Sequence, residues 1–507
     1  MIRREARKLV QRDVRKVPDR KRSRENELRR IAIALLVCAL LAPVSSAEPA
    51  AVAPVAERSS DLAARLDAAL ASRGLRRARV SALVVRASDG AVLFERSPDR
   101  ALTPASNMKI LTAMAALELF GPTHRFETAV LADREPDMKG EVGALYVRGG
   151  GDPVLNSEDW WRLAADLHGR GLRHVRGDLV LDDGVFDGAR WHPDWGAVSS
   201  RAYHAPVGGL SANYGAFAVT VRPGVRAGDP VGVEVDPPVA YLAISNRGRT
   251  GQPGQRSTLA VDRSRGAAGE LVTVDGSIPA GSAPTTYYRS VLDPTRYAGA
   301  VLRMQLEALG VVVDGETRIG KVPEGAASLL VFKGRPLAEI VRLFVKYSNN
   351  AVAESLVKAM GAFATGEPGS WDNGIRASRG ALESLGVDLD GLQIVDGSGL
   401  SYRDKLTPRA LVDALRIAHD SFRIGPELTA ALPIANGDGT LERRVEGAPG
   451  LVRAKTGLLN RVTSLSGYAA MPGGEIAVFS VLTNGYRGSD EEAMDALDRF
   501  VATLSGS

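Results

Sequence analysis

The chain contains the motif Ser106-Asn107-Met108-Lys109, which leads directly into the apolar segment Ile110 to Phe120. A serine and a lysine three residues apart lie one turn apart on the same face of a helix. The nearly continuous apolar residues predict a helix buried between layers, with Ser106 at its N-terminus. A desolvated lysine that has lost its proton can activate a serine hydroxyl as a nucleophile.

Lysine is rare in this chain, which contains 11 lysines and 53 arginines. Arginine stays protonated at any useful pH, so a retained lysine is where proton transfer becomes possible. A second Ser-x-x-Lys motif occurs at Ser355 to Lys358. Because about 0.8 matches are expected by chance in this composition, the first motif does not establish an active site by itself.

The N-terminal segment has the features of a secretory signal peptide. The first 30 residues carry 13 Lys/Arg and 5 Asp/Glu, Ile31 to Ala42 carry no charge, and Ser45-Ser46-Ala47 offers small residues for cleavage. We therefore predict a signal peptide over 1–47 and a periplasmic or other extracytoplasmic location. The apolar run is too short to span a bilayer comfortably, so we expect no integral membrane span after cleavage.

Removal of this leader changes the electrostatic character of the protein. The formal charge of the whole chain is +5, and loss of the basic leader leaves about −3. The mature protein is therefore not expected to bind nucleic acid. The single cysteine, Cys38, leaves with the leader, so the mature chain has no disulfide or thiol chemistry.

The roughly 460 residues after the leader exceed one ordinary hydrophobic core. Residues 125–324 contain short strand-like runs between Gly, Pro and Asp turns, which predicts a β-rich insertion of two nested subdomains. The flanking segments, 48–124 and 325–507, are predicted to form one α+β catalytic domain. We expect its elements to be a hairpin over 78–95, a helical stretch over 337–360, C-terminal strands over 453–456, 463–471 and 475–483, and a helix over 490–504.

Two further motifs follow the first in order, Ser348-Asn349-Asn350 and Lys455-Thr456-Gly457. This order is typical of penicillin-binding proteins and serine β-lactamases. With gaps of 242 and 107 residues between the motifs, the chain resembles the low-molecular-mass class C penicillin-binding proteins, which are D-alanyl-D-alanine carboxypeptidases and endopeptidases. The resemblance implies a transpeptidase-like antiparallel sheet flanked by helices and interrupted by the insertion.

Local signatures extend this resemblance over most of the mature chain. They are Gly149-Gly150-Gly151-Asp152-Pro153, Leu181-Asp182-Asp183, Asp396-Gly397-Ser398-Gly399-Leu400-Ser401 and Gly437-Asp438-Gly439-Thr440-Leu441. The motif order also argues against Ser355, which follows the Ser348-x-Asn350 motif on what should be the same helix. Asp152, Asp396 and Asp438 lie beside glycines and are interpreted as turn formers rather than catalytic acids.

The resemblance assigns a role to each motif. Ser106 is the expected nucleophile and Lys109 its base. Ser348 would relay a proton between Lys109 or Lys455 and the leaving amine, and Asn350 would hold the substrate amide and the Lys109 side chain. If the resemblance did not hold, Ser348 and Asn350 could equally form a simple helix cap.

The third motif is expected to bind the substrate. Lys455 and Thr456 would bind the terminal carboxylate, and Gly457 lets the strand approach the substrate backbone. The backbone N–H groups of Ser106 and Leu458 would bind the oxyanion. Leu458 departs from the family, which commonly has Thr or Ser there, so a side-chain contact to the carboxylate is missing.

Three residues are candidates for binding the far end of the diamino acid in the substrate's stem peptide: Trp191, Asp194 and Arg403. Some relatives bind that zwitterionic group with one acidic and one basic residue near the cleft. A plain surface salt bridge is the alternative for Asp194 and Arg403.

The sequence thus predicts an exported serine-type D-Ala-D-Ala carboxypeptidase without cofactor or metal. Its partners would be peptidoglycan peptides, with β-lactams as covalent inhibitors, and DD-endopeptidase activity stays open. The alternatives are a serine β-lactamase-like hydrolase and a non-catalytic cell-envelope binding protein. A Ser/His/Asp hydrolase is disfavoured because the chain has no Gly-x-Ser-x-Gly motif and its six histidines are scattered.

Overall fold

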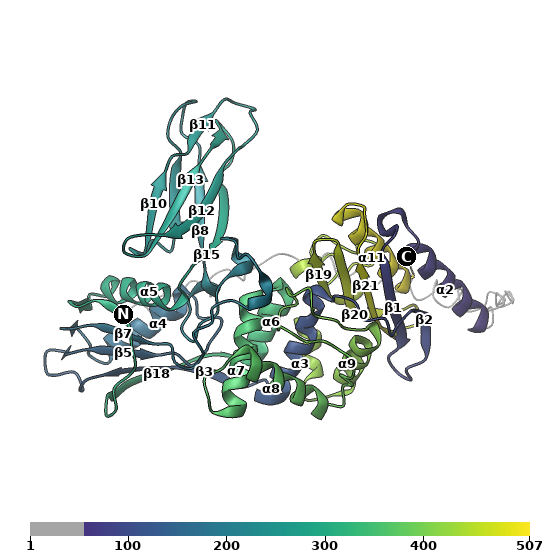
Figure 1. Cartoon of the computed structure of the whole chain (residues 1–507), viewed down its shortest axis with the longest axis horizontal. Coiled ribbons are helices and arrows are strands. Elements are labelled where there is room, and N and C mark those ends of the chain that lie inside the picture. Colours follow the sequence, from purple (N-terminus) through teal and green to yellow (C-terminus); the bar gives the residue numbers. More distant parts are fainter. Residues whose placement is uncertain (1–54, 507) are drawn as a thin grey trace, which may run out of the picture. The chain divides into compact units, whose positions relative to one another are not determined.

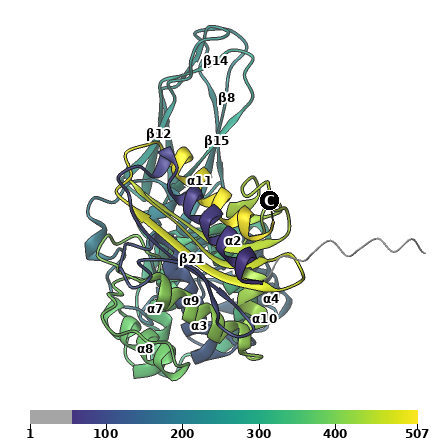
Figure 2. The same cartoon turned by 90° about the vertical axis from the view of Figure 1, so that its right-hand side faces the viewer.

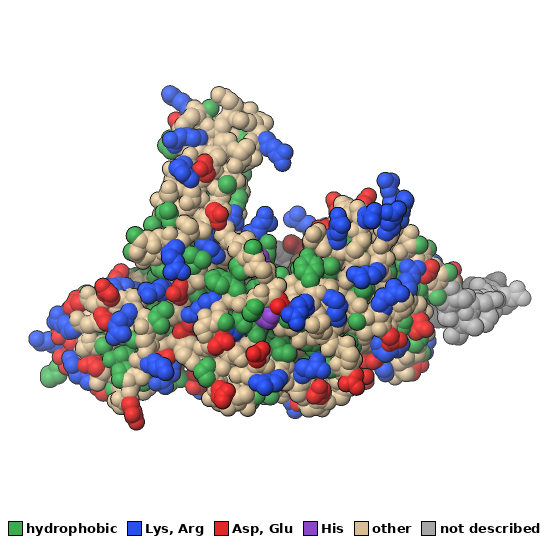
Figure 3. Space-filling view, viewed as in Figure 1, with side chains coloured by type: hydrophobic (Ala, Val, Ile, Leu, Met, Phe, Trp, Pro, Cys, Tyr) green, Lys and Arg blue, Asp and Glu red, His purple; other side chains and the backbone are tan. Residues whose placement is uncertain are grey.

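The computed structural model describes residues 55–506, and residues 59–507 form one compact unit (Figure 1). The signal peptide predicted over 1–47 lies outside the described residues. Among the described helices, none has the length and apolar character needed to cross a membrane. On the face shown in Figure 3, acidic and basic side chains are interspersed over the body of the molecule.

A five-stranded antiparallel sheet joins the two ends of the described chain. Its strand order is β19-β20-β21-β1-β2, and β1 pairs with β21 along its whole length. The predicted hairpin and C-terminal strands are confirmed. The strands are β1 (Arg79–Arg86), β2 (Val92–Arg96), β19 (Val452–Leu459), β20 (Val462–Ala470) and β21 (Ile476–Asn484).

The two faces of this sheet bury alternate residues of the same strands. Val84 and Phe479 contribute to a core with α2 (Val55–Leu70) and α11 (Asp490–Leu504), which cover one face in Figure 2. Leu83 and Val478 contribute to the larger core on the opposite face. This alternation is the two-residue period of a strand that is buried on both sides.

Helices form the layer behind the second face of the sheet. The central one, α3 (Met108–Phe120), is buried through Leu117, as its continuous apolar sequence predicts. The others include three helices between residues 371 and 431 for which the sequence analysis made no prediction. They are α6 (Leu337–Tyr347), α7 (Asn350–Thr365), α8 (Trp371–Ser384), α9 (Pro408–Asp420) and α10 (Gly425–Ala431).

The helical stretch expected over 337–360 is wrong as one continuous element. Ser348 takes a left-handed conformation with φ 58° and ends α6. The Asn349 side chain then accepts a hydrogen bond from the Val352 N–H and caps α7. Because a left-handed residue cannot continue an α-helix, this break places Ser348 between the two helices and makes Asn350 the first residue of α7.

The first part of the insertion is not purely β. Its sheet has the order β17-β7-β5-β3-β18, a smaller sheet has the order β16-β6-β4, and two unforeseen helices pack together beside them. The helices begin with signals visible in the sequence, a capping box at Asn156 and Asp159 and the Asp293-Pro294 start. The helices are α4 (Ser157–Gly169) and α5 (Pro294–Ala308); the strands are β3 (Arg125–Ala132), β4 (Glu141–Val142), β5 (Leu145–Arg148), β6 (His174–Val175), β7 (Leu179–Asp182), β16 (Val312–Val313), β17 (Thr317–Ile319) and β18 (Ala327–Pro336).

The expected boundary at residue 324 falls inside this part of the structure, because β18 pairs with β3 and continues to Pro336. A second part, built of strands, is nested between β7 and α5, and it confirms strand-like runs expected within 125–324. Since residues 59–507 cluster as one unit, the division into separate domains stays a prediction. The nested strands are β8 (Ala216–Arg222), β9 (Gly232–Asp236), β10 (Leu242–Asn246), β11 (Arg249–Gly251), β12 (Ala260–Arg265), β13 (Glu270–Asp275), β14 (Ser277–Pro279) and β15 (Thr285–Ser290).

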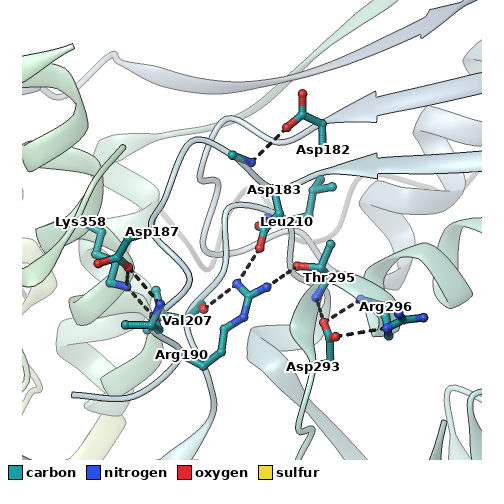
Figure 4. A network of polar contacts seen from close by, with 12 residues as sticks. Asp182, Asp183, Asp187, Arg190, Val207, Leu210, Asp293, Thr295, Arg296 and Lys358 are labelled. Atoms are coloured by element: carbon teal, nitrogen blue, oxygen red, sulfur yellow. Dashed lines mark hydrogen bonds and ion pairs between the residues drawn. The ribbon is translucent and has the colours of Figure 1, made fainter. Parts of the chain in front are cut away.

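The segment after β7 is tied to α7 by a buried lysine (Figure 4). The Lys358 side chain is fully buried and forms an ion pair with Asp187. It also donates to the Ala189 carbonyl at 2.6 Å and lies 3.9 Å from the centre of the Trp371 ring. In the same segment, Arg190 forms a largely buried ion pair with Asp183 at 2.6 Å. These contacts fix the segment over 183–190 against α7.

We expect Lys358→Met to lower the free energy of unfolding by about 1–3 kcal/mol, because the partly exposed Asp187 carboxylate and the Ala189 carbonyl lose their donor. Lys333→Met is the matched control. Lys333 forms an exposed pair with Glu127 at 3.2 Å, so its loss should cost less than about 1 kcal/mol. Urea denaturation of both variants measures this difference, and equal costs would contradict the anchoring role of Lys358.

Candidate active site

Ser106 lies in the short 3-10 turn Ala105–Asn107, directly before α3. The fully buried Lys109 Nζ contacts three oxygens: Ser106 Oγ at 2.9 Å, Asn350 Oδ1 at 2.7 Å and the Ser398 carbonyl at 2.7 Å. Burial lowers the pKa of Lys109 to about 7, although nearby carboxylates oppose the shift. Near neutral pH a large fraction of Lys109 is therefore uncharged.

The two acceptors other than Ser106 fix where the lone pair of a neutral Lys109 points. The Ser398 carbonyl can only accept, and the Asn350 amide is oriented because its Nδ2 donates to the Tyr203 carbonyl at 3.0 Å. A neutral amine has two hydrogens, which these two oxygens take. The lone pair of Lys109 is then left for the proton of the Ser106 hydroxyl.

A second buried lysine lies on the opposite side of the site. Lys455 Nζ donates to Ser348 Oγ at 3.0 Å and to the Thr456 carbonyl at 2.8 Å. Burial, and then the positive charges of Lys109 and Arg444, lower the pKa of Lys455 well below its usual value. The structure thus brings the three sequence motifs together around two desolvated amines.

The strand β19, which carries the third motif, is an edge strand of the five-stranded sheet. Its outer backbone groups up to Ala454 bond to residues 433–435, and those after Ala454 can pair with an extended peptide. A Cβ at Gly457 would overlap the Ser464 hydroxyl and lie 2.9 Å from the Pro104 carbonyl, so only glycine fits beside the turn that carries Ser106. The Leu458 side chain is 47% exposed.

Comparison with known proteins agrees with this geometry. The family model for the D-Ala-D-Ala carboxypeptidase 3 (S13) family matches residues 62–504. A D-alanyl-D-alanine carboxypeptidase of Actinomadura sp. (strain R39) is 38% identical over 94% of this chain and 91% of its own length. The chain belongs to the D-Ala-D-Ala carboxypeptidase 3 (S13) family. The family and enzyme class expected from the three motifs are thereby confirmed.

Other members and solved structures extend the likeness. The D-alanyl-D-alanine carboxypeptidase DacB of Haemophilus influenzae is 28% identical over 77% of this chain and 82% of its own length. The crystal structure of penicillin-binding protein 4 (DacB) from that organism superposes with a TM-score of 0.74 at 24% identity, covering 88% of this chain and 98% of that one. This likeness confirms the expected fold class.

Within this S13 site, the candidate specificity residues Asp194 and Arg403 are paired with each other. Arg403 Nη1 lies 2.9 Å from Asp194 Oδ2, and the Arg403 side chain is 65% exposed. The third candidate, Trp191, donates from Nε1 to the His204 carbonyl at 2.8 Å. The pair also lines a cavity of about 730 Å³ with Trp371. A role in binding the substrate's diamino acid therefore remains a prediction.

The second Ser-x-x-Lys motif, Ser355 to Lys358, has a structural role. Lys358 points towards Asp187 and the Ala189 carbonyl, as described above. Both Ser355 and Lys358 are buried within α7. The buried pairing of Lys358 explains why this position is a lysine without assigning it a part in proton transfer.

Several residues of the site were not predicted from the sequence. Ser398 supplies the carbonyl that contacts Lys109, and Thr440 contacts the Thr456 hydroxyl at 2.7 Å. Both belong to signatures that were quoted only as family features. The fully buried Glu354 was missed altogether, although an acidic residue amid the buried apolar residues of α7 is itself a signal of a functional or structural contact.

Gly399 lets the loop that carries Ser398 touch the turn that carries Ser106. It has φ +79°, and a Cβ there would overlap the Ala105 carbonyl. We expect Gly399→Ala to destabilise the protein and slow acylation by a fluorescent penicillin more than tenfold, because it displaces the residue before the nucleophile.

The matched control is Gly391→Ala. Gly391 has φ +70° with no atom within 4 Å of the added Cβ, so this variant adds only the left-handed strain of about 1–2 kcal/mol. Equal acylation rates for the two variants would show that the close approach at Gly399 does not position Ser106.

Proposed function

We propose that this protein is an exported serine-type D-Ala-D-Ala carboxypeptidase that cleaves peptidoglycan stem peptides through an acyl-serine intermediate. The observation that carries the proposal is the 2.9 Å contact between the buried Lys109 amine and the Ser106 hydroxyl. A solved relative, penicillin-binding protein 4 of Haemophilus influenzae, is described in complex with a β-lactam. That complex supports β-lactams as ligands of this protein, and their acylation of Ser106 is part of the proposal.

In the acylation step, neutral Lys109 takes the hydroxyl proton as Ser106 Oγ attacks the carbonyl carbon of the penultimate D-alanine. The negative charge on the carbonyl oxygen is stabilised by the backbone N–H groups of Ser106 and Leu458. The C–N bond then breaks, and terminal D-alanine leaves once its nitrogen has gained a proton. We assign the relay to Ser348, which accepts a hydrogen bond from Lys455. It passes the proton held by Lys109 to that nitrogen, so Lys109 is neutral again when D-alanine leaves.

The substrate carboxylate couples the two lysines. Its negative charge beside Lys455 and the Thr456 hydroxyl favours the protonated form of Lys455. Because the two lysines repel each other when both are charged, a protonated Lys455 favours the neutral form of Lys109. The carboxylate charge is then balanced by protonated Lys455, so substrate can bind while Lys109 stays able to accept a proton.

Hydrolysis of the acyl-enzyme completes the cycle. Water attacks the ester carbon, Lys109 accepts a proton from that water, and the proton returns to Ser106 Oγ when the C–O bond breaks. A β-lactamase would perform this step rapidly on the penicilloyl ester, whereas we expect a long-lived adduct here. The DD-endopeptidase reaction cleaves the same kind of bond, with a peptide rather than free D-alanine as the leaving group.

The proposal is tested by incubating the mature protein with purified pentapeptide and cross-linked muropeptides. We expect release of free D-alanine from the pentapeptide and a penicillin adduct mapped to the peptide that contains Ser106. Loss of cross-linked dimers would add the DD-endopeptidase activity. Ser106→Ala should lower the rate by more than about 10⁴-fold, because no other group can form the ester.

Ser355→Ala is the matched control, since it removes the serine of the second Ser-x-x-Lys motif. It should retain both reactions. A Ser106→Ala protein that still forms the adduct would overturn the acyl-serine proposal, and rapid nitrocefin turnover without D-alanine release would favour the β-lactamase alternative. A wild-type protein that neither reacts with penicillin nor cleaves muropeptides would favour the non-catalytic alternative.

A further inference from the structure

The loop Asp396–Ser401 packs against the base of the proposed reaction. Its Ser398 carbonyl accepts from Lys109 Nζ at 2.7 Å, and its Gly397 carbonyl accepts from Thr112 Oγ1 on α3 at 2.7 Å. Gly399 adjoins Ala105, the residue before the nucleophile. The position of this loop therefore determines where the Ser398 carbonyl meets Lys109.

Glu354 holds the loop from the side of α7. Its carboxylate is fully buried and accepts from the Ser398 N–H at 2.7 Å, the Gly397 N–H at 3.1 Å and the Trp371 indole at 2.8 Å. A fully buried carboxylate is costly unless it is well hydrogen-bonded. Three converging donors meet that requirement and fix the peptide that carries the Ser398 carbonyl.

Asp396 holds the same loop from within and links it to the insertion. Its Oδ1 accepts from the N–H groups of Ser398 and Gly399 at 3.1 and 2.6 Å, and its Oδ2 accepts from the Ser401 N–H at 2.8 Å. The remaining donor is the indole of Trp195, at 2.9 Å from Oδ2. Trp195 ends the short 3-10 helix Pro193–Trp195 of the insertion.

We propose that Glu354, Asp396 and Trp195 are positioning residues for proton transfer, which hold the Ser398 carbonyl where it takes one hydrogen of the Lys109 amine and leaves the lone pair facing Ser106. This inference rests on the proposed function, because it assumes that Lys109 is the base. It gives the insertion a part in the reaction, through an indole that touches neither Ser106 nor Lys109.

The charges around Lys109 come from several elements. Asp396, Glu354 and Asp404 raise its pKa, and burial lowers it more strongly. Lys455 lies on the other side. Burial raises the pKa of Glu354 to about 7 and the pKa of Asp404 well above its usual value. Trp195→Phe keeps all of these groups and removes only the indole donor to Asp396. A loosened loop would admit water beside Lys109, and its pKa would rise towards the usual value of lysine.

The test measures acylation by a fluorescent penicillin across pH in the mature protein carrying Trp195→Phe. We expect the acylation rate constant to fall on the order of tenfold, the loss typical of a hydrogen bond to a charged group, with little change in the preceding noncovalent binding. The acidic limb of the rate profile should move to higher pH, because a higher pKa of Lys109 leaves less neutral base at a given pH.

Trp160→Phe is the matched control. Its buried indole donates to the Ser211 carbonyl at 3.2 Å within the insertion, so the variant loses a similar bond without touching the loop. It should lower the thermal midpoint while keeping the wild-type pH profile. Identical profiles for Trp195→Phe and wild type would overturn the inference and assign Trp195 to stability alone.

A second variant covers the case in which Trp195→Phe does not fold. Trp371→Phe removes one donor to Glu354 from the other side of the loop and should move the acidic limb in the same direction; an unmoved limb would overturn the inference. Failure of the proposed function gives a different result, since the wild-type protein would then form no adduct at Ser106.

Discussion

The structure depends most on the burial of one amine. Lys109 is fully enclosed, and its only polar contacts in the described chain are the Ser106 hydroxyl, the Asn350 amide oxygen and the Ser398 carbonyl. In water such an amine would be charged and inert as a base. Enclosure makes the neutral form accessible, and the two acceptors other than Ser106 decide which way its lone pair points. Each neighbouring element contributes to this enclosure.

Three elements that are distant in sequence meet at this amine. The turn before α3 supplies the nucleophile, and the left-handed break places Ser348 between α6 and α7, with Asn350 at the start of α7. The edge strand β19 brings Lys455 opposite Lys109. Gly399 and Gly457 let their own backbones lie against the turn that carries Ser106, which a Cβ at either position would prevent. The insertion adds the Trp195 indole, so it is connected to the same loop as the base rather than simply attached to the catalytic sheet.

Much of this arrangement could be predicted from the sequence, because motif order and strand periodicity are local signals. The hairpin, the C-terminal strands, α3 and α11 follow directly from apolar patterns. The break at Ser348 was missed, although the polar residues Lys346 to Asn350 interrupt the apolar pattern there. Glu354 and the Ser398 carbonyl were missed for a different reason: no sequence motif tells which backbone N–H groups a buried carboxylate binds, or which backbone carbonyl contacts an amine. Helices α4 and α5 were missed although their caps are readable.

The central claim is that Lys109 is neutral near physiological pH. NMR titration of the mature protein with ¹³C-labelled lysine side chains tests it directly, and Lys109→Arg assigns the resonance. The account predicts that one of the few lysine signals titrates with a pKa of about 7 and disappears in that variant. A Lys109 signal that titrates near the ordinary lysine value of about 10.4 would contradict the account, because the base beside Ser106 would then be a charged ammonium.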